Sequence, residues 1–172
     1  VKNPTLNGAI TGSGNLVYKG WWNHGAVNHT YTGNTLLANA SVGTNGAGTS
    51  HFGVGGTVTL EGTSTLGLNT SGNVLSNPLV LDSTEQNGGI SNCPLIMEQN
   101  TVISGTVTML RDSGVFTHGA GPTPLISGVI SGAFDFHVNA PFLTTASNLS
   151  LTAVNTYTGK TVVHKCTCTQ TN

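Results

Sequence analysis

The feature of this 172-residue chain that most constrains its fold is a pattern that occurs once near each end. Residues 30–37 read TYTGNTLL and residues 156–163 read TYTGKTVV. A second pair of matching segments accompanies them, because residues 8–12 read GAITG and residues 128–132 read GVISG. Self-similarity of this kind is the signature of repeat proteins, in which each unit buries its apolar face against its neighbour.

The matching segments define one repeat-like unit near residues 8–42 and another near residues 126–168, within a single domain spanning residues 1–172. We expect each unit to be roughly 30 to 40 residues long, a length typical of solenoid repeats. The tetrapeptide GTVT also occurs twice, at residues 56–59 and 105–108, which indicates degenerate copies between the two units.

Short runs of alternating apolar and polar residues indicate strands throughout the chain. Residues 56–60 (GTVTL), 105–109 (GTVTM) and 149–153 (LSLTA) each place apolar side chains on one face. These runs are about five residues long and are bounded by Gly, Asn or Ser, which favour turns. No window has a helical period, and 24 glycines interrupt the chain. The sequence therefore predicts an all-β fold.

The low charge of the chain favours one kind of all-β fold. Only 6% of its residues are charged, against about 25% in an ordinary soluble domain. Stacked coils need few charges, because backbone ladders and inward rows of aliphatic side chains stabilise them. We therefore predict a parallel β-helix, or solenoid. A β-sandwich or jelly roll is the alternative, since these folds share a strand-rich composition.

Three segments carry a resemblance to a known family. Residues 8–16 (GAITGSGNL) with residues 30–35 (TYTGNT), and again residues 155–161 (NTYTGKT), resemble the passenger-associated strand repeat of bacterial autotransporters. The resemblance implies a right-handed parallel β-helix that is secreted or held at a cell surface. Family members serve in adhesion, aggregation and presentation of other domains. Trp21 and Trp22 depart from the repeat, which usually has small polar residues there.

The scattered charges and histidines argue against several functions. The five basic residues form no stripe of the kind that binds nucleic acid. No apolar run approaches the ~18 residues of a membrane span, so we expect no membrane insertion. We expect the six histidines on the surface or in turns, and no metal or other cofactor, because their spacing matches no metal motif. The histidines are His24, His29, His51, His118, His137 and His164.

The acidic residues do not suggest an active site. Glycoside hydrolysis needs two facing carboxylates. The charged residues that lie close together in the sequence are Asp82 with Glu85 and Arg111 with Asp112. We therefore expect solvated acidic side chains and a protein that is not an enzyme. The six acidic residues are Glu61, Asp82, Glu85, Glu98, Asp112 and Asp135.

Four aromatic residues are the candidates for binding or assembly, namely Trp21, Trp22, Tyr31 and Tyr157. An exposed pair at Trp21 and Trp22 can stack on sugar rings or fill a pocket of a partner. In the alternative interpretation, one of the two rings packs in the core and the other covers the edge of a coil. The sequence leaves both interpretations open.

Three cysteines are present, and an odd number in a secreted protein leaves one thiol over or one for another chain. Cys166 and Cys168 are two residues apart, so on a strand they face the same side. One of them can pair with Cys93 within the chain. Three buried thiols without a bridge are the alternative.

Three functional hypotheses follow. The leading one is a structural extracellular β-helix that stacks head to tail on copies of itself, because repeat-like sequence lies near both ends. Such stacking produces a fibre or a surface layer. The alternative is an adhesin segment that binds a glycan or a host surface through Trp21 and Trp22. The third is a carbohydrate-active β-helix enzyme that uses Asp82 or Glu85.

Overall fold

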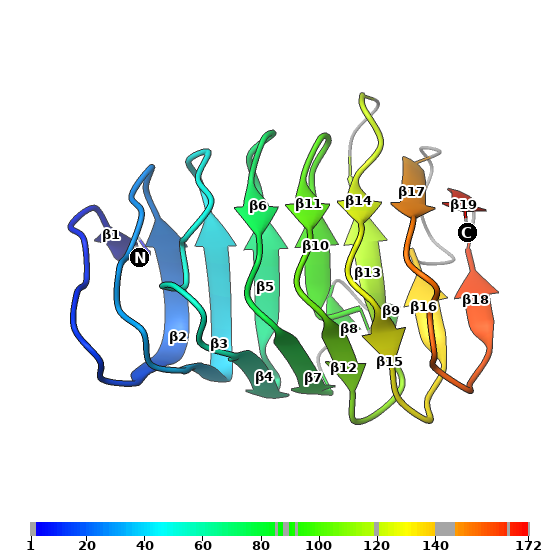
Figure 1. Ribbon diagram of the computed structural model, residues 1–172, viewed down its shortest axis with the longest axis horizontal. Helices are drawn as coiled ribbons and strands as arrows, with labels where there is room; N and C mark the ends of the chain where they lie inside the picture. Colours follow the sequence, from blue (N-terminus) through cyan, green and yellow to red (C-terminus); the bar gives the residue numbers. More distant parts are fainter. Residues whose placement is uncertain are drawn as a thin grey trace.

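The computed structural model describes residues 3–84, 86–87, 90–91, 93–118, 121–139, 147–164 and 166–171. Within these residues every regular element is a strand, and the strands wind in coils along one long axis (Figure 1). Pairing between successive coils is parallel. The predicted parallel β-solenoid is therefore confirmed, and the antiparallel β-sandwich or jelly roll is not the fold.

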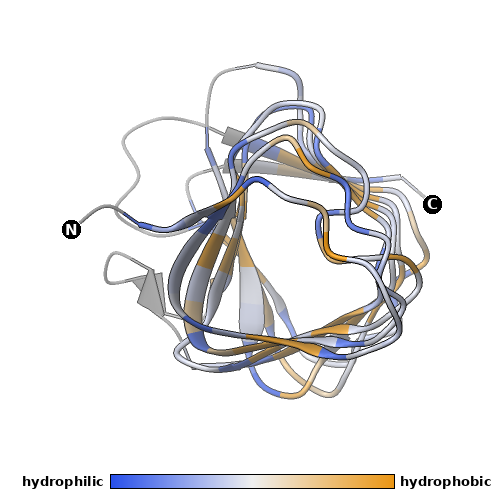
Figure 2. Ribbon diagram, turned by 90° about the vertical axis from the view of Figure 1, so that its left-hand side faces the viewer, coloured by the Kyte–Doolittle hydropathy of each residue, from blue (hydrophilic) through white to orange (hydrophobic). Residues whose placement is uncertain are grey.

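Each coil has up to three faces, which enclose a common interior (Figure 2). The first face contains the N-terminal parts of β2 (Leu16–His24) and β3 (Thr35–Thr44), then β4 (Val58–Gly62), β7 (Leu79–Ser83), β12 (Val107–Met109) and β15 (Ile130–Ser131). The second face contains β1 (Thr5–Leu6), the C-terminal parts of β2 and β3, β5 (Thr65–Leu68), β10 (Leu95–Met97), β13 (Ser113–Thr117), β16 (Phe136–Val138) and β18 (Thr161–Val163).

The third face contains β6 (Val74–Leu75), β11 (Val102–Ile103), β14 (Leu125–Ile126), β17 (Ser147–Leu151) and β19 (Cys166–Gln170). Because β2 and β3 continue around the corner, the first two faces form one 12-stranded sheet, whereas the third face is a separate five-stranded sheet. An antiparallel hairpin of β8 (Gln86–Asn87) and β9 (Ile90–Ser91) interrupts one coil.

Pairing registers set the length of a coil. Val107 pairs with Leu79 on one side and with Ile130 on the other. A coil there takes about 23 to 28 residues, a usual period for a solenoid. Each predicted repeat-like unit, residues 8–42 or residues 126–168, therefore spans more than one coil, and the expected unit length is wrong.

The two copies of the TYTG motif have the same local structure on different faces. The hydroxyl of Tyr31 is hydrogen-bonded to that of Thr35, and the hydroxyl of Tyr157 to that of Thr161. Thr35 begins β3 on the first face, whereas Thr161 begins β18 on the second. The two copies therefore share the conformation of a corner, but they do not occupy equivalent positions in their coils.

Inward side chains stack in rows that run along the axis, because equivalent strands pair in register. Fully burying one such aliphatic side chain stabilises the fold by roughly 1.5–3 kcal/mol. On the first face a row consists of Leu37, Leu60, Leu81 and Met109. On the second it consists of Val42, Leu66, Leu95, Val115 and Val138, and on the third of Leu75, Ile103, Ile126 and Leu151.

Asparagine and aspartate side chains link the corners of successive coils. Asn15 Oδ1 accepts the backbone N–H of Asn34 at 2.9 Å, and Asn34 Oδ1 accepts that of Thr57 at 3.0 Å. Asp112 Oδ1 accepts the N–H of Asp135 in the same way at 2.9 Å. Each bond satisfies a backbone donor at a turn, where the sheet ladder does not. The corners thus explain part of the Asn-rich composition.

Candidate functional site

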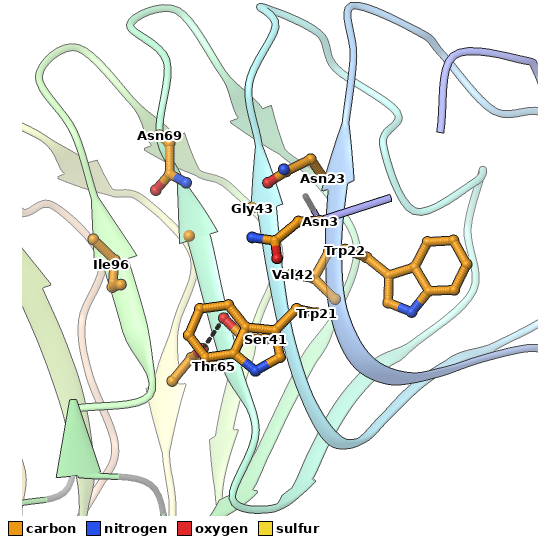
Figure 3. A pocket seen from close by; sticks show the side chains of 11 residues that line it. Asn3, Trp21, Trp22, Asn23, Ser41, Val42, Gly43, Thr65, Asn69 and Ile96 are labelled. Carbon is orange, nitrogen blue, oxygen red and sulfur yellow. Dashed lines mark hydrogen bonds between the residues drawn. The ribbon is translucent and has the colours of Figure 1, made fainter. Parts of the chain in front are cut away.

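The Trp21 groove consists of two adjoining hollows on the outer surface of the second face, with volumes of about 200 Å³ and 430 Å³. Figure 3 shows the smaller hollow with the side chains that line it. It lies near the N-terminal end of the solenoid, over β2, β3, β5 and β10. Both hollows are lined by Trp21, Ser41, Thr65 and Ile96. The smaller hollow is also lined by Asn3, Asn23 and Asn69, among others.

A corner in β2 separates the two tryptophans. The register of β2 against β3 shifts between Tyr18 and Gly20, and Gly20 has a positive φ of 77°. Beyond this corner, neighbouring residues point to opposite sides of the strand. Trp21 therefore points outward, with 66% of its surface exposed, whereas Trp22 is half-buried and packs against the core. The two rings therefore do not form an exposed pair: one packs against the core, as the alternative interpretation expected, and the other is exposed.

Trp22 is fixed by two interactions. Its ring lies edge-on to Tyr18, with centroids 5.9 Å apart. Its Nε1 donates a hydrogen bond to the backbone oxygen of Lys19 at 2.8 Å. Trp22 therefore helps to hold β2 in the orientation that presents Trp21 to the groove.

Amide and hydroxyl groups form the rest of the groove. Gly43 and Gly67 pair in register, and the missing side chains leave the space that the Asn69 amide occupies. A Cβ at Gly43 would lie 2.6 Å from Asn69 Nδ2, and one at Gly67 would lie 2.4 Å from Asn69 Oδ1. Thr65 Oγ1 donates a hydrogen bond to Ser41 Oγ at 2.9 Å. No sequence motif pointed to these residues as a group, because only the strand register brings them together.

The Trp21 groove carries no formal charge. No Asp, Glu, Lys, Arg or His side chain is among the described residues that line the two hollows. An aromatic ring beside uncharged donors and acceptors can hold a ligand that has both an apolar face and hydroxyl groups.

A histidine cluster fills the interior of the N-terminal coils. His24, His29 and His51 are all buried. The expectation of surface or turn positions is therefore wrong for His24 and His29, whereas His51 does lie in a turn. The ring centroid of His24 lies 5.2 Å from that of His29 and 6.0 Å from that of His51. Tyr18 and Phe52 pack on His24, each with centroids 5.3 Å away. Within the described part of the chain, no group of three His, Cys, Asp or Glu side chains is arranged to hold a metal ion.

The other predicted binding and disulfide residues lie apart from the groove. Tyr31 is buried and Tyr157 is half-buried, each at its own corner. Cys93 is a buried thiol that packs against Phe116, outside the main core, and its pKa is raised by burial. The remaining cysteines, Cys166 and Cys168, both belong to β19. Cys93 is a free thiol in the structure and is in no disulfide.

The charged side chains lie outside the groove as well. Asp82 forms an ion pair with Arg111. The register places Glu61 beside Asp82 on the neighbouring strand, a proximity that the sequence did not suggest. Glu85, the other residue of the enzymatic hypothesis, lies outside the described residues. None of the five acidic residues that the structure describes lines either hollow of the groove.

Comparison with known proteins gives no match: no family model fits the chain, and no curated protein or solved structure matches it. The resemblance to the autotransporter passenger repeat therefore rests on the sequence motifs alone. Among the described residues there is also no helix long and apolar enough to cross a membrane.

Proposed function

We propose that this protein is a non-enzymatic, extracellular β-solenoid that binds neutral glycans in the Trp21 groove. The observation that carries the proposal is the exposed Trp21 ring beside a groove of amide and hydroxyl groups without charge. A sugar ring has an apolar face that stacks on an aromatic ring, and hydroxyl groups that bond to amides. The resemblance to adhesive passenger repeats supports a location outside the cell.

The lack of charge in the groove defines the expected class of ligand. Acidic sugars such as uronic or sialic acids need a cationic partner when their carboxylate loses water, and the groove lining provides none. Neutral oligosaccharides place only hydroxyl groups against Asn23, Asn69 and Thr65. We therefore expect selection of neutral over anionic glycans.

A glycan array with matched variants tests this proposal. Trp21→Ala removes the aromatic wall, and we expect it to abolish binding to every neutral glycan that the parent protein retains. Val17→Ala is the control, because Val17 is half exposed on the same strand but does not line the groove. Equal binding by the parent and by Trp21→Ala, or retention of anionic glycans only, would contradict the proposal.

A second candidate function is head-to-tail self-assembly into a fibre or surface layer. It is favoured by the last coil that the structure describes, where β18 pairs with β16 and β19 pairs with β17 on one side each. Among the described residues β18 and β19 are the last strands in the order of their sheets, and Val163 at the end of β18 is 44% exposed. Such edges are templates for another strand.

Electron microscopy of the purified protein, with and without reductant, tests the assembly hypothesis. Filaments with a repeat along the solenoid axis are the expected result. Filaments that shorten in reductant would indicate that a cysteine of β19 joins neighbouring copies. Monodisperse monomers under all conditions would rule the hypothesis out.

A further inference from the structure

The histidine cluster makes one contact that joins two coils directly. His29 Nδ1 accepts a hydrogen bond from the backbone N–H of Ile10 at 3.0 Å. The acceptor nitrogen carries no proton, so His29 is the neutral tautomer with its proton on Nε2. Protonation would place a hydrogen on Nδ1, and an imidazolium ion cannot accept the bond from Ile10. The contact therefore exists only while His29 is neutral.

The first coil, residues 5–15, has few other anchors. Leu6 and Ile10 are half-buried and all its other residues are exposed. Its remaining attachments are chiefly backbone hydrogen bonds, including those from Thr30 to the Ile10 oxygen and from Thr32 to the Gly12 oxygen, both at 2.9 Å. A segment with so little buried apolar surface belongs to the least stable part of a fold. Loss of one bond at its centre therefore matters more than it would in the core.

The surroundings of the cluster resist a positive charge. Both ring nitrogens of His24, as well as Nε2 of His29 and Nδ1 of His51, are buried without a hydrogen-bond partner among the described residues. The titratable groups that face His29 and His24 are each other, His51, and the phenols Tyr18 and Tyr31. A phenol stays uncharged in acid, so none of these groups provides a negative charge to balance an imidazolium.

Burial and the charge of His51 lower the pKa of His29. Burial lowers the pKa of His24 most, and the positive charges of His29 and His51 lower it as well, so that it falls to about 3. Only the interaction with the backbone of His51 acts in the opposite direction. Groups with a depressed pKa stay neutral in the folded protein but take up protons once they are released. Their contribution to stability is complete above the ordinary histidine pKa of about 6.5 and declines as the pH falls below it.

We propose that His29 is an acid-sensitive latch, which holds the first coil on the solenoid at neutral pH and releases it in acid. The release requires only that a proton reach Nδ1 when the Ile10 contact opens. The freed imidazolium is then solvated and does not return to the cluster. The edge of β2 is uncovered as a consequence, because β1 is its pairing partner on that side.

Hydrogen exchange measured by mass spectrometry at pH 7.5 and pH 5.0 tests the latch, after correction for the intrinsic effect of pH on exchange. For peptides from residues 5–15 we expect exchange to rise about ten- to thirtyfold at pH 5.0, since each pH unit below 6.5 favours the protonated open form up to tenfold. Peptides from β10 and β13 should change less than those from residues 5–15, because these two strands hold none of the three histidines of the cluster.

Two variants separate the latch from general acid sensitivity. In His29→Asn the amide oxygen occupies the place of Nδ1 along the side chain and accepts a hydrogen bond but does not titrate. We expect this variant to lose the acid response of the first coil even if its exchange at pH 7.5 is faster than that of the parent. His118→Asn is the control, because His118 is exposed and far along the chain, and it should respond to acid as the parent does.

Three results would overturn the proposal. The first is a rise in exchange at pH 5.0 that is equal in all coils of the parent protein. The second is an undiminished acid response of the first coil in His29→Asn. The third is slower exchange at residues 5–15 on addition of Zn²⁺ at pH 7.5, lost in His29→Asn, because the cluster would then be a metal site.

Discussion

The interiors of the N-terminal and central coils differ in kind although the backbone winds in the same way. Central coils are filled by register-matched aliphatic rows, such as Leu81 beside Met109. At the N-terminal end the same space contains His24, His29 and His51. Aliphatic side chains have no polar atoms, so packing contacts alone are enough for them. Buried imidazole rings need hydrogen-bond partners, and several of their nitrogens have none among the described residues.

This difference suggests that the central and the N-terminal coils have different roles. The central coils form a rigid support, because every coil there buries the same kind of side chain against its two neighbours. The features that a ligand or a change of pH can act on, the Trp21 groove and the histidine cluster, both involve β2. Four predictions test whether the two regions respond differently.

The largest difference should come from cavities in the core. Leu81→Ala leaves a void in a fully buried central row, and we expect it to lower the free energy of unfolding by about 2–5 kcal/mol. Ile10→Ala in the first coil should cost about 1 kcal/mol at most, since Ile10 is only half-buried. Guanidinium denaturation measures both values. Equal losses would mean that the first coil is as firmly packed as the centre.

The next largest difference should come from glycine substitutions, which we expect to lower stability in the central coils but not in the first coil. A Cβ at Gly105 would lie 2.0 Å from the backbone oxygen of Asn77, so Gly105→Ala forces two coils apart and should cost about 3 kcal/mol. A Cβ at Gly14 meets no atom within 4 Å, and Gly14→Ala should be neutral or stabilising by a few tenths of a kcal/mol. Melting temperatures of the two variants provide the comparison, and a harmless Gly105→Ala would contradict the tight stacking of the corners.

Acid should weaken the N-terminal coils by a smaller amount. The pKa of His24 is lowered to about 3 in the fold, so stability falls as the pH drops below about 6.5, by about 2 kcal/mol at pH 5.0. His24→Phe keeps a ring among Tyr18 and Phe52 and removes the titrating group. We expect this variant to lose that part of the pH dependence in denaturation curves recorded from pH 7.5 to pH 5.0. An unchanged slope would show that His24 is not the group responsible.

The surface ion pair of the central coils should contribute least. Arg111 Nε donates to Asp82 Oδ1 at 2.7 Å, but both side chains are partly exposed to solvent. Arg111→Ala should therefore change the free energy of unfolding by about 1 kcal/mol or less, and the change should shrink in high salt. A loss as large as that of Leu81→Ala would show that charge, and not the aliphatic rows, stabilises the centre.

The repetitive part of the fold could be predicted from the sequence. The predicted runs 56–60 and 105–109 overlap β4 (Val58–Gly62) and β12 (Val107–Met109), with Val58, Leu60 and Val107 buried as their alternation indicated. These features are local, because a strand of period two and its flanking turns are encoded within a few residues. The parallel stacking followed from the similarity of such runs to one another.

The candidate sites could not be predicted in the same way. Asn23 and Asn69 reach one groove only because β2, β3 and β5 pair in a particular register. His29 and His51 meet His24 because the segments that follow β2 and β3 stack on each other, with the His29 N–H bonded to the Ser50 oxygen at 2.9 Å, and no sequence spacing encodes that stacking. Trp21 and Trp22 were the groove residues that their own chemistry singled out, as adjacent aromatic side chains where the resembling repeat usually has small polar residues.

The most direct test of ligand binding at the N-terminal coils is a fluorescence titration with a neutral oligosaccharide retained on the array. Both tryptophans of the protein lie in β2, so intrinsic fluorescence reports this region alone. We predict a saturable change in emission in the parent protein and in Val17→Ala, and none in Trp21→Ala. Binding that calorimetry detects without any change in tryptophan emission, and with equal affinity in Trp21→Ala, would place recognition elsewhere and contradict the account.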